Sequence, residues 1–74
     1  MSQPLTQMHV GQQGQVTAIN SAVESRLVNL STYGLVPGSL ITLRQRHFAY
    51  VVMIGETEVA LDKEVAREIM VQVQ

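Results

Sequence analysis

The stretch "YGLVPGSLITL", residues 33–43, constrains the fold more than any other part of the chain. Gly34 follows an amphipathic stretch and can take the left-handed conformation that ends a helix, with Leu35 turned back against that helix. Pro37 presets the φ angle for the second position of a β-turn, and Gly38 accepts the positive φ of a type II turn at the third. The sequence therefore predicts a helix, a chain reversal and a strand in direct succession.

The segment before this corner has the pattern of an amphipathic helix. Ser21 and Glu24 fit a capping box, in which each side chain accepts a hydrogen bond from the backbone N–H of the other, so we expect the helix to start there. Val23, Leu27 and Leu30 recur at helical spacing, which places them on one face. We predict that this face packs on the core, and that Leu30 meets the leucine after the corner glycine, as in a Schellman ending.

Much of the remaining chain alternates between apolar and polar residues or is rich in β-branched residues, as strands are. Strands are expected at residues 15–20, 39–46, 50–54 and 57–61, with a last edge strand at 70–73. Because so few short strands leave unpaired edges unless the sheet curls, we expect a small β-barrel. The predicted fold class is mainly β with one or two short helices.

The connections carry patterns of their own. Apolar residues and glycines spaced by three predict an N-terminal turn followed by a tight bend: Leu5, Met8, Gly11 and Gly14. Gly55 and Glu56 predict a hairpin turn between two strands. Asp62 is expected to cap a short helix over residues 63–69.

Composition narrows the function classes. A chain of 74 residues makes at most one domain, residues 1–74, and the absence of cysteine excludes disulfides and cysteine-bound zinc. A net charge of −1 argues against nucleic-acid binding, which normally needs a dense basic patch. The first ten residues lack the pattern of a secretory leader, and no apolar run reaches the roughly 20 residues that cross a bilayer, so we expect a cytoplasmic protein without membrane insertion.

One connection gathers the candidate partner-binding residues. Arg44 and Arg46 alternate along a predicted strand, so we expect both on one face, where they could meet an acidic patch on a partner. His47, Phe48 and Tyr50 follow at or near the hairpin tip, where an exposed aromatic side chain can anchor an interface. The alternative is a solvated strand face with aromatic side chains packed back on the barrel.

The sequence contains little that indicates a catalytic or metal-binding site. No nucleophile with a base and no carboxylate pair is visible, so no enzyme and no catalytic residue is expected. His47 is the candidate metal ligand, alone or with Glu56 or Glu58, and His9 is the other histidine of the chain. Each histidine is more simply interpreted as a surface residue, because neither has ligands at metal-binding spacing. A homo-oligomer remains open, since 46% hydrophobic residues in so small a barrel can leave apolar surface exposed.

Taken together, these patterns resemble the FeoA family, ferrous iron transport protein A, which has an SH3-like barrel. The resemblance rests on the N-terminal pattern given above, on the first strand, on the helix and corner, and on the C-terminal part. The residues beyond the N-terminal pattern are Val16, Ile19, Leu27, Leu30, Gly34, Leu35, Pro37, Gly38, Val59, Ala60, Leu61, Ala66, Ile69 and Val71.

The resemblance implies a non-enzymatic cytoplasmic accessory of ferrous iron transport that acts on the G-protein domain of an FeoB-type membrane transporter. One alternative is a protein that binds, carries or senses a transition metal such as Fe(II), although no cofactor is expected from the residues. Another is a regulatory SH3-like domain that acts with an iron-dependent repressor.

Overall fold

The computed structural model describes all 74 residues and contains one six-stranded antiparallel sheet with two short α-helices. In chain order the elements are β1 (Ser2–Pro4), the 3₁₀-helix η1 (Leu5–Gln7), β2 (Gln13–Ile19), α1 (Glu24–Thr32), β3 (Leu40–Gln45), β4 (Tyr50–Ile54), β5 (Thr57–Leu61), α2 (Lys63–Glu68) and β6 (Ile69–Val73). The strand order across the sheet is β1-β6-β2-β3-β4-β5, so β1 and β5 are its edges. The expected mainly β, SH3-like fold class is confirmed.

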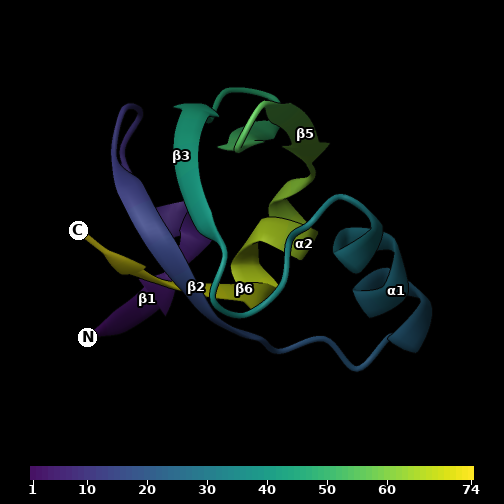
Figure 1. The fold of residues 1–74 in the computed structure, drawn as a ribbon. Helices are drawn as coiled ribbons and strands as arrows, with labels where there is room; N and C mark the ends of the chain where they lie inside the picture. The colour runs from purple at the N-terminus through teal and green to yellow at the C-terminus, as the bar shows by residue number, and fades with distance from the viewer.

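The sheet curls around one hydrophobic core, while α1 stands to one side of it (Figure 1). The two chain ends lie together at the opposite side, beside β1 and β6, which pair with each other (Figure 1). The core is a single cluster of 14 buried residues: Leu5, Met8, Val16, Leu30, Leu35, Ile41, Leu43, Tyr50, Val52, Val59, Leu61, Ala66, Ile69 and Val71. The strands supply most of these residues at alternating positions, because successive side chains of a strand point to opposite faces.

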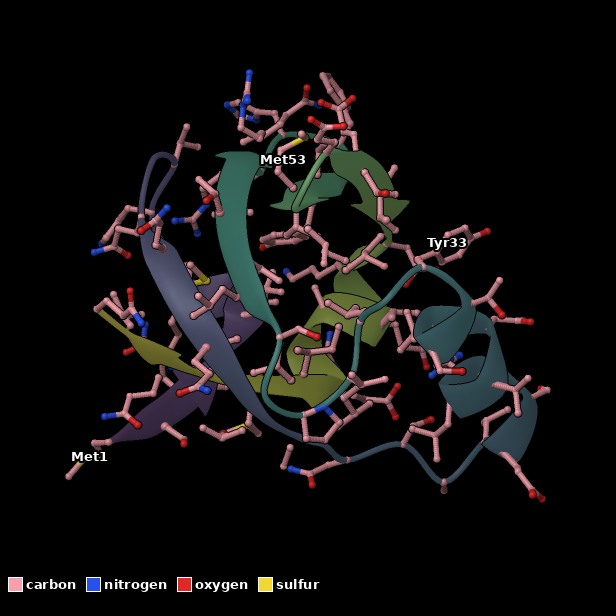
Figure 2. The ribbon with its side chains drawn as sticks, in the orientation of Figure 1. Met1, Tyr33 and Met53 are labelled. Carbon is pink, nitrogen blue, oxygen red and sulfur yellow. The ribbon has the colours of Figure 1, made fainter.

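The corner after α1 forms as predicted. The backbone N–H of Leu35 donates to the carbonyl of Leu30 at 3.0 Å, and that of Gly34 donates to Ser31 at 3.0 Å, which is the Schellman pair of hydrogen bonds. Gly34 has a φ of 85°. Tyr33, the C-cap residue, projects from this corner into solvent (Figure 2).

The turn that follows the Schellman ending is of type II. Gly38 has a φ of 99°, and the N–H of Ser39 donates to the carbonyl of Val36 at 3.0 Å. The N–H of Gly38 also donates to the carbonyl of Val16 at 2.7 Å, which ties the corner to β2. The corner is therefore a structural device that ends a helix and starts a strand.

The predicted start of α1 was wrong. Its N-cap is Val23, whose carbonyl accepts the first helical bond, from Arg26 at 3.1 Å, and no side chain caps the helix. The hydroxyl of Ser21 accepts instead from the N–H of Val23 at 3.1 Å, a local turn that competes with capping. Val23 is consequently 45% exposed rather than in the core, and Leu27 is half-buried.

Two expectations about the sheet were also wrong. The last strand, β6, is not an edge strand, because it lies between β1 and β2. Gly14 does not make a bend; it lies within β2 at a close approach, where an added Cβ would sit 3.3 Å from the carbonyl oxygen of Gln72. The turn is made earlier, at Gly11, which has a φ of 94°.

The C-terminal connections agree with the sequence. Gly55 has a φ of 60° in the two-residue turn between β4 and β5, as a type II′ hairpin requires at this position. Asp62 caps α2, since its Oδ1 accepts from the N–H of Val65 at 2.8 Å. None of the helices is long and apolar enough to cross a bilayer.

Candidate functional site

The connection between β3 and β4, residues 46–49, is the first of two surface features that could carry function. A register shift between Leu43 and Gln45 leaves Arg44 without an opposite residue on β4, and β3 ends at Gln45. The two arginines therefore do not alternate along one regular strand, which corrects the expectation that they share a face. Such a bulge bends the strand locally and interrupts the regular alternation of its side chains.

Arg46 reaches back across the molecule rather than outward. Its Nη1 donates to the carbonyl of Met8 at 3.0 Å, and its Nη2 donates to the carbonyl of Thr6 at 3.3 Å. Both carbonyls belong to the turn formed by η1 and its C-cap residue, where unsatisfied acceptors attract a cation. Arg46 thus fixes the hairpin loop to the N-terminal segment, while Arg44 is exposed and has no hydrogen-bond partner.

Phe48 is the most unusual residue of this loop. It has a φ of 67°, the only positive φ outside glycine, and its side chain is fully exposed. The N–H of Ala49 donates to the carbonyl of His47 at 2.7 Å, which closes a γ-turn around Phe48. A γ-turn with positive φ at its centre is rare and strained, and such strain is found most often at functional sites.

The other two predicted residues have different surroundings. His47 is exposed, and its ring lies 6.0 Å from that of Phe48, centroid to centroid, at a tilt of 44°. Tyr50 is only 8% exposed and belongs to the core cluster, because it is the first residue of β4 and faces inward. Tyr50 is therefore not at the hairpin tip and is not available as a surface anchor. The partner-binding role of the rest stays a prediction.

The structure contains no group of three or more His, Cys, Asp or Glu side chains placed to hold a metal ion. Of the two candidate histidines, His47 contacts Phe48, and His9 is exposed in the turn before β2. Metal binding through His47 stays a prediction of the sequence.

The second surface feature is a groove of about 370 Å³ between α1, the end of β5 and the start of α2. Its walls combine five apolar residues with four polar ones: Val23, Ser25, Arg26, Asn29, Leu30, Ala60, Leu61, Asp62 and Val65. A concave surface that offers both apolar and polar groups is a candidate binding site, although its lining is more polar than that of most small-molecule sites. The sequence patterns did not reveal this groove, since they place Val23 in the core.

One ion pair holds the groove together. Arg26 on α1 donates through Nη1 to Oε1 of Glu68, the last residue of α2, and both side chains are about three-quarters buried, with 27% and 25% exposed. Besides this pair, α1 is anchored by its buried residue Leu30 and by the Schellman corner. The groove therefore lies between the sheet and a helix that is held by one ion pair, one buried side chain and its C-terminal corner.

Comparison with protein families decides the relationship. The family model described as FeoA domain matches residues 3–73. The chain belongs to the FeoA family. No match was found among curated protein sequences.

Solved structures agree with the FeoA assignment. A crystal structure of an iron uptake regulatory protein (FeoA) has 28% sequence identity to this chain and a TM-score of 0.88. The match covers 100% of this chain and 99% of that protein's chain. The solution structure of an FeoA protein from Chlorobium tepidum is 19% identical, with a TM-score of 0.85, over 95% of this chain and 69% of that one. The fold also occurs in IdeR of T. acidophilum, at 20% identity and a TM-score of 0.92, where 99% of this chain matches 34% of the longer protein.

The FeoA match covers both surface features, the strained hairpin loop and the groove. The likeness to IdeR shows a shared fold only, because a fold can host unrelated functions. Choosing between the two features therefore depends on their own geometry.

Proposed function

We propose that this FeoA-family chain is a non-enzymatic accessory of ferrous iron transport, which docks on the cytoplasmic G-protein domain of an FeoB-type membrane transporter and modulates it. The observation that carries the proposal is the FeoA match over residues 3–73, nearly the whole chain. The proposed localisation is cytoplasmic, since the partner domain is on that side of the membrane.

The groove is the docking surface that the geometry favours. Its lining includes Val23, an aliphatic side chain that is 45% exposed. Desolvating such an aliphatic side chain favours association by about 25 cal/mol for each Å² of apolar surface removed from water. The polar side chains at the margin, Asn29 and Asp62, can supply the hydrogen bonds that give an interface its specificity.

Co-purification with the transporter's cytoplasmic domain, loaded in turn with GDP and with a non-hydrolysable GTP analogue, tests the proposal. We expect retention of the chain in at least one nucleotide state. Loss of retention in both states would contradict the proposed partner.

A matched pair of variants tests the groove. Val23→Asn removes the aliphatic side chain from the groove without changing the charge and supplies α1 with the N-cap side chain that it lacks, so the fold is expected to be at least as stable. Val28→Asn makes the same change on the same helix at a 58% exposed position outside the groove. We expect Val23→Asn to lose retention and Val28→Asn to keep it; equal retention of both variants would move the docking surface elsewhere.

A further inference from the structure

The outer edge of β5 carries free hydrogen-bonding groups. β5 pairs only with β4, and the two-residue turn between them makes Ile54 and Thr57 a hydrogen-bonded pair. Because hydrogen-bonded and non-hydrogen-bonded pairs alternate in an antiparallel ladder, Val59 and Leu61 also bond to β4. The N–H and C=O groups of Glu58 and Ala60 therefore point away from the sheet, and no turn, loop or cap hydrogen bond uses them.

The groove opens at this same edge. Ala60 and Leu61 both line it, although consecutive residues of a strand point to opposite faces of the sheet. Leu61 is the last residue of β5, and Asp62 and Val65 also line the groove, so the groove lies against the C-terminal end of this strand. The other wall is α1, which lies on the same side of the molecule as β5 (Figure 1). A strand added to β5 would therefore reach the groove at the Ala60 and Leu61 end of the edge.

The charge around this edge is strongly negative. Residues 56–68 contain five carboxylates, those of Glu56, Glu58, Asp62, Glu64 and Glu68, against the two cations of Lys63 and Arg67. Only the carboxylate of Glu68 is in an ion pair. On the other wall, α1 begins with the sixth acidic residue of the chain, Glu24, and carries Arg26, which lines the groove and pairs with Glu68. A segment that binds along this edge is therefore favoured when it is basic.

We propose that the edge of β5 accepts an extended peptide segment, in which basic residues alternate with aliphatic ones, as a seventh strand. The outward groups of Glu58 and Ala60 bond to the backbone of the segment, as in other cases of strand addition. One aliphatic side chain of the segment enters the groove, and the basic side chains face the carboxylates of β5 and α2. The inference rests on the proposed function, because it describes how a segment of the docking partner is held.

The same charges disfavour a second copy of the chain at this edge. Pairing of two β5 edges brings Glu58 and Asp62 of each copy toward the other copy's acidic surface. Like charges placed together at an interface oppose association. The occupant that fits is a basic segment.

The amide protons of Glu58 and Ala60 report on strand addition directly. The probe is a capped synthetic peptide in which lysine alternates with valine, and its control is the same peptide with glutamate in place of lysine. At ten times the dissociation constant of the lysine peptide, we expect exchange of these two amides with solvent to slow about tenfold, because only the unbound fraction exchanges freely. The glutamate peptide is expected to leave both exchange rates unchanged.

Two pairs of variants separate backbone pairing from charge. Ala60→Pro removes one outward N–H, which an edge strand tolerates, and is expected to weaken binding about tenfold, whereas Ala60→Ser keeps the N–H and the affinity. Glu58→Gln is expected to weaken binding about threefold, whereas Gln72→Lys, an equal change of net charge at an exposed side chain of β6, is not. The Glu58 pair keeps the test valid if Ala60→Pro fails to fold.

Three results would overturn the inference: unchanged exchange of the Glu58 and Ala60 amides at saturating peptide, protection that rises with protein concentration without peptide, or equal binding of both peptides. The second would assign the edge to a second copy. None of them bears on co-purification with the transporter domain, which can succeed through another surface, so failure of the inference and failure of the proposed function are distinguishable.

Discussion

Replacing Phe48 by glycine is expected to stabilise the protein, although it deletes the largest side chain of the hairpin loop. The phenyl group is fully exposed, so its removal costs no buried apolar surface. Its φ of 67° lies in the left-handed region, which glycine adopts without a steric penalty. The substitution also removes the tilted packing of the phenyl ring on the ring of His47, at 6.0 Å between centroids, but this pair is at the surface.

The size of the effect follows from two opposing terms. A residue other than glycine in the left-handed region costs about 1–2 kcal/mol. Glycine offsets part of this gain, because it loses about 0.5–1 kcal/mol more chain entropy on folding. The net expectation for Phe48→Gly is therefore a stabilisation of about 0.5–1 kcal/mol, or roughly 2–8 °C in Tm for a domain of this size.

Thermal unfolding followed by circular dichroism measures the effect, with Phe48→Ala as the matched control. Alanine removes the same ring but keeps the left-handed strain, so its Tm is expected to stay close to that of the parent. If Phe48→Gly and Phe48→Ala melt together, or if Phe48→Gly is destabilised, the loop is not strained, and backbone strain then gives no reason to assign Phe48 a function.

Three further substitutions test local features. Arg46→Ala removes two hydrogen bonds to backbone carbonyls and is expected to lower the free energy of unfolding by about 1–3 kcal/mol, as measured by chemical denaturation. Arg44→Ala is expected to change it by no more than about 0.5 kcal/mol. Equal losses for both variants would contradict the contacts assigned to Arg46. Gly34→Ala is expected to lower the free energy of unfolding by about 1–2 kcal/mol, because alanine adopts a positive φ at a steric cost. Gly34→Asn is expected to lower it by less, since asparagine tolerates this conformation better. The added Cβ itself meets only one side-chain atom, at 3.7 Å, so crowding contributes little. Asp62→Ala is expected to cost about 1 kcal/mol and Asp62→Asn much less, as measured by urea unfolding; similar losses for both would mean that the cap does not stabilise α2.

Features that depend on neighbouring residues could be predicted from the sequence. The Schellman ending at Gly34, the type II turn at Gly38 and the cap at Asp62 each need only a few consecutive residues of the right type. Their geometry is set by backbone conformations that few residue types adopt, so composition and spacing identify them.

Features that depend on distant residues could not be predicted in this way. The partners of Arg46 lie 38 and 40 positions away in the sequence, and nothing in the local pattern shows that its side chain turns back. The interior position of β6 follows from its pairing with β1 and β2, whose partner residues are fifty or more positions away. The groove is formed by α1, β5 and α2 together, which the sequence does not place next to one another. The predicted helix start also assigned Val23 to the core, although this residue lines the groove.

The two surface features lie on different parts of the fold and predict different partner contacts. The hairpin loop presents an exposed aromatic residue, Phe48, on a loop that Arg46 fixes to η1. The groove has a mixed aliphatic and polar lining and adjoins the open edge of β5, in a part of the chain rich in carboxylates. The groove can take up a side chain and a backbone together, which makes it the stronger candidate for docking.

Docking on the transporter is tested most directly by a titration of the isotopically labelled chain with the unlabelled cytoplasmic domain of the FeoB-type transporter, in GDP and GTP-analogue forms, followed by amide chemical shifts. We predict saturable shifts that cluster on α1, the end of β5 and the start of α2 in at least one nucleotide form. No saturable shifts in either form would contradict docking on this partner, and shifts confined to residues 44–50 would place the contact on the hairpin loop instead.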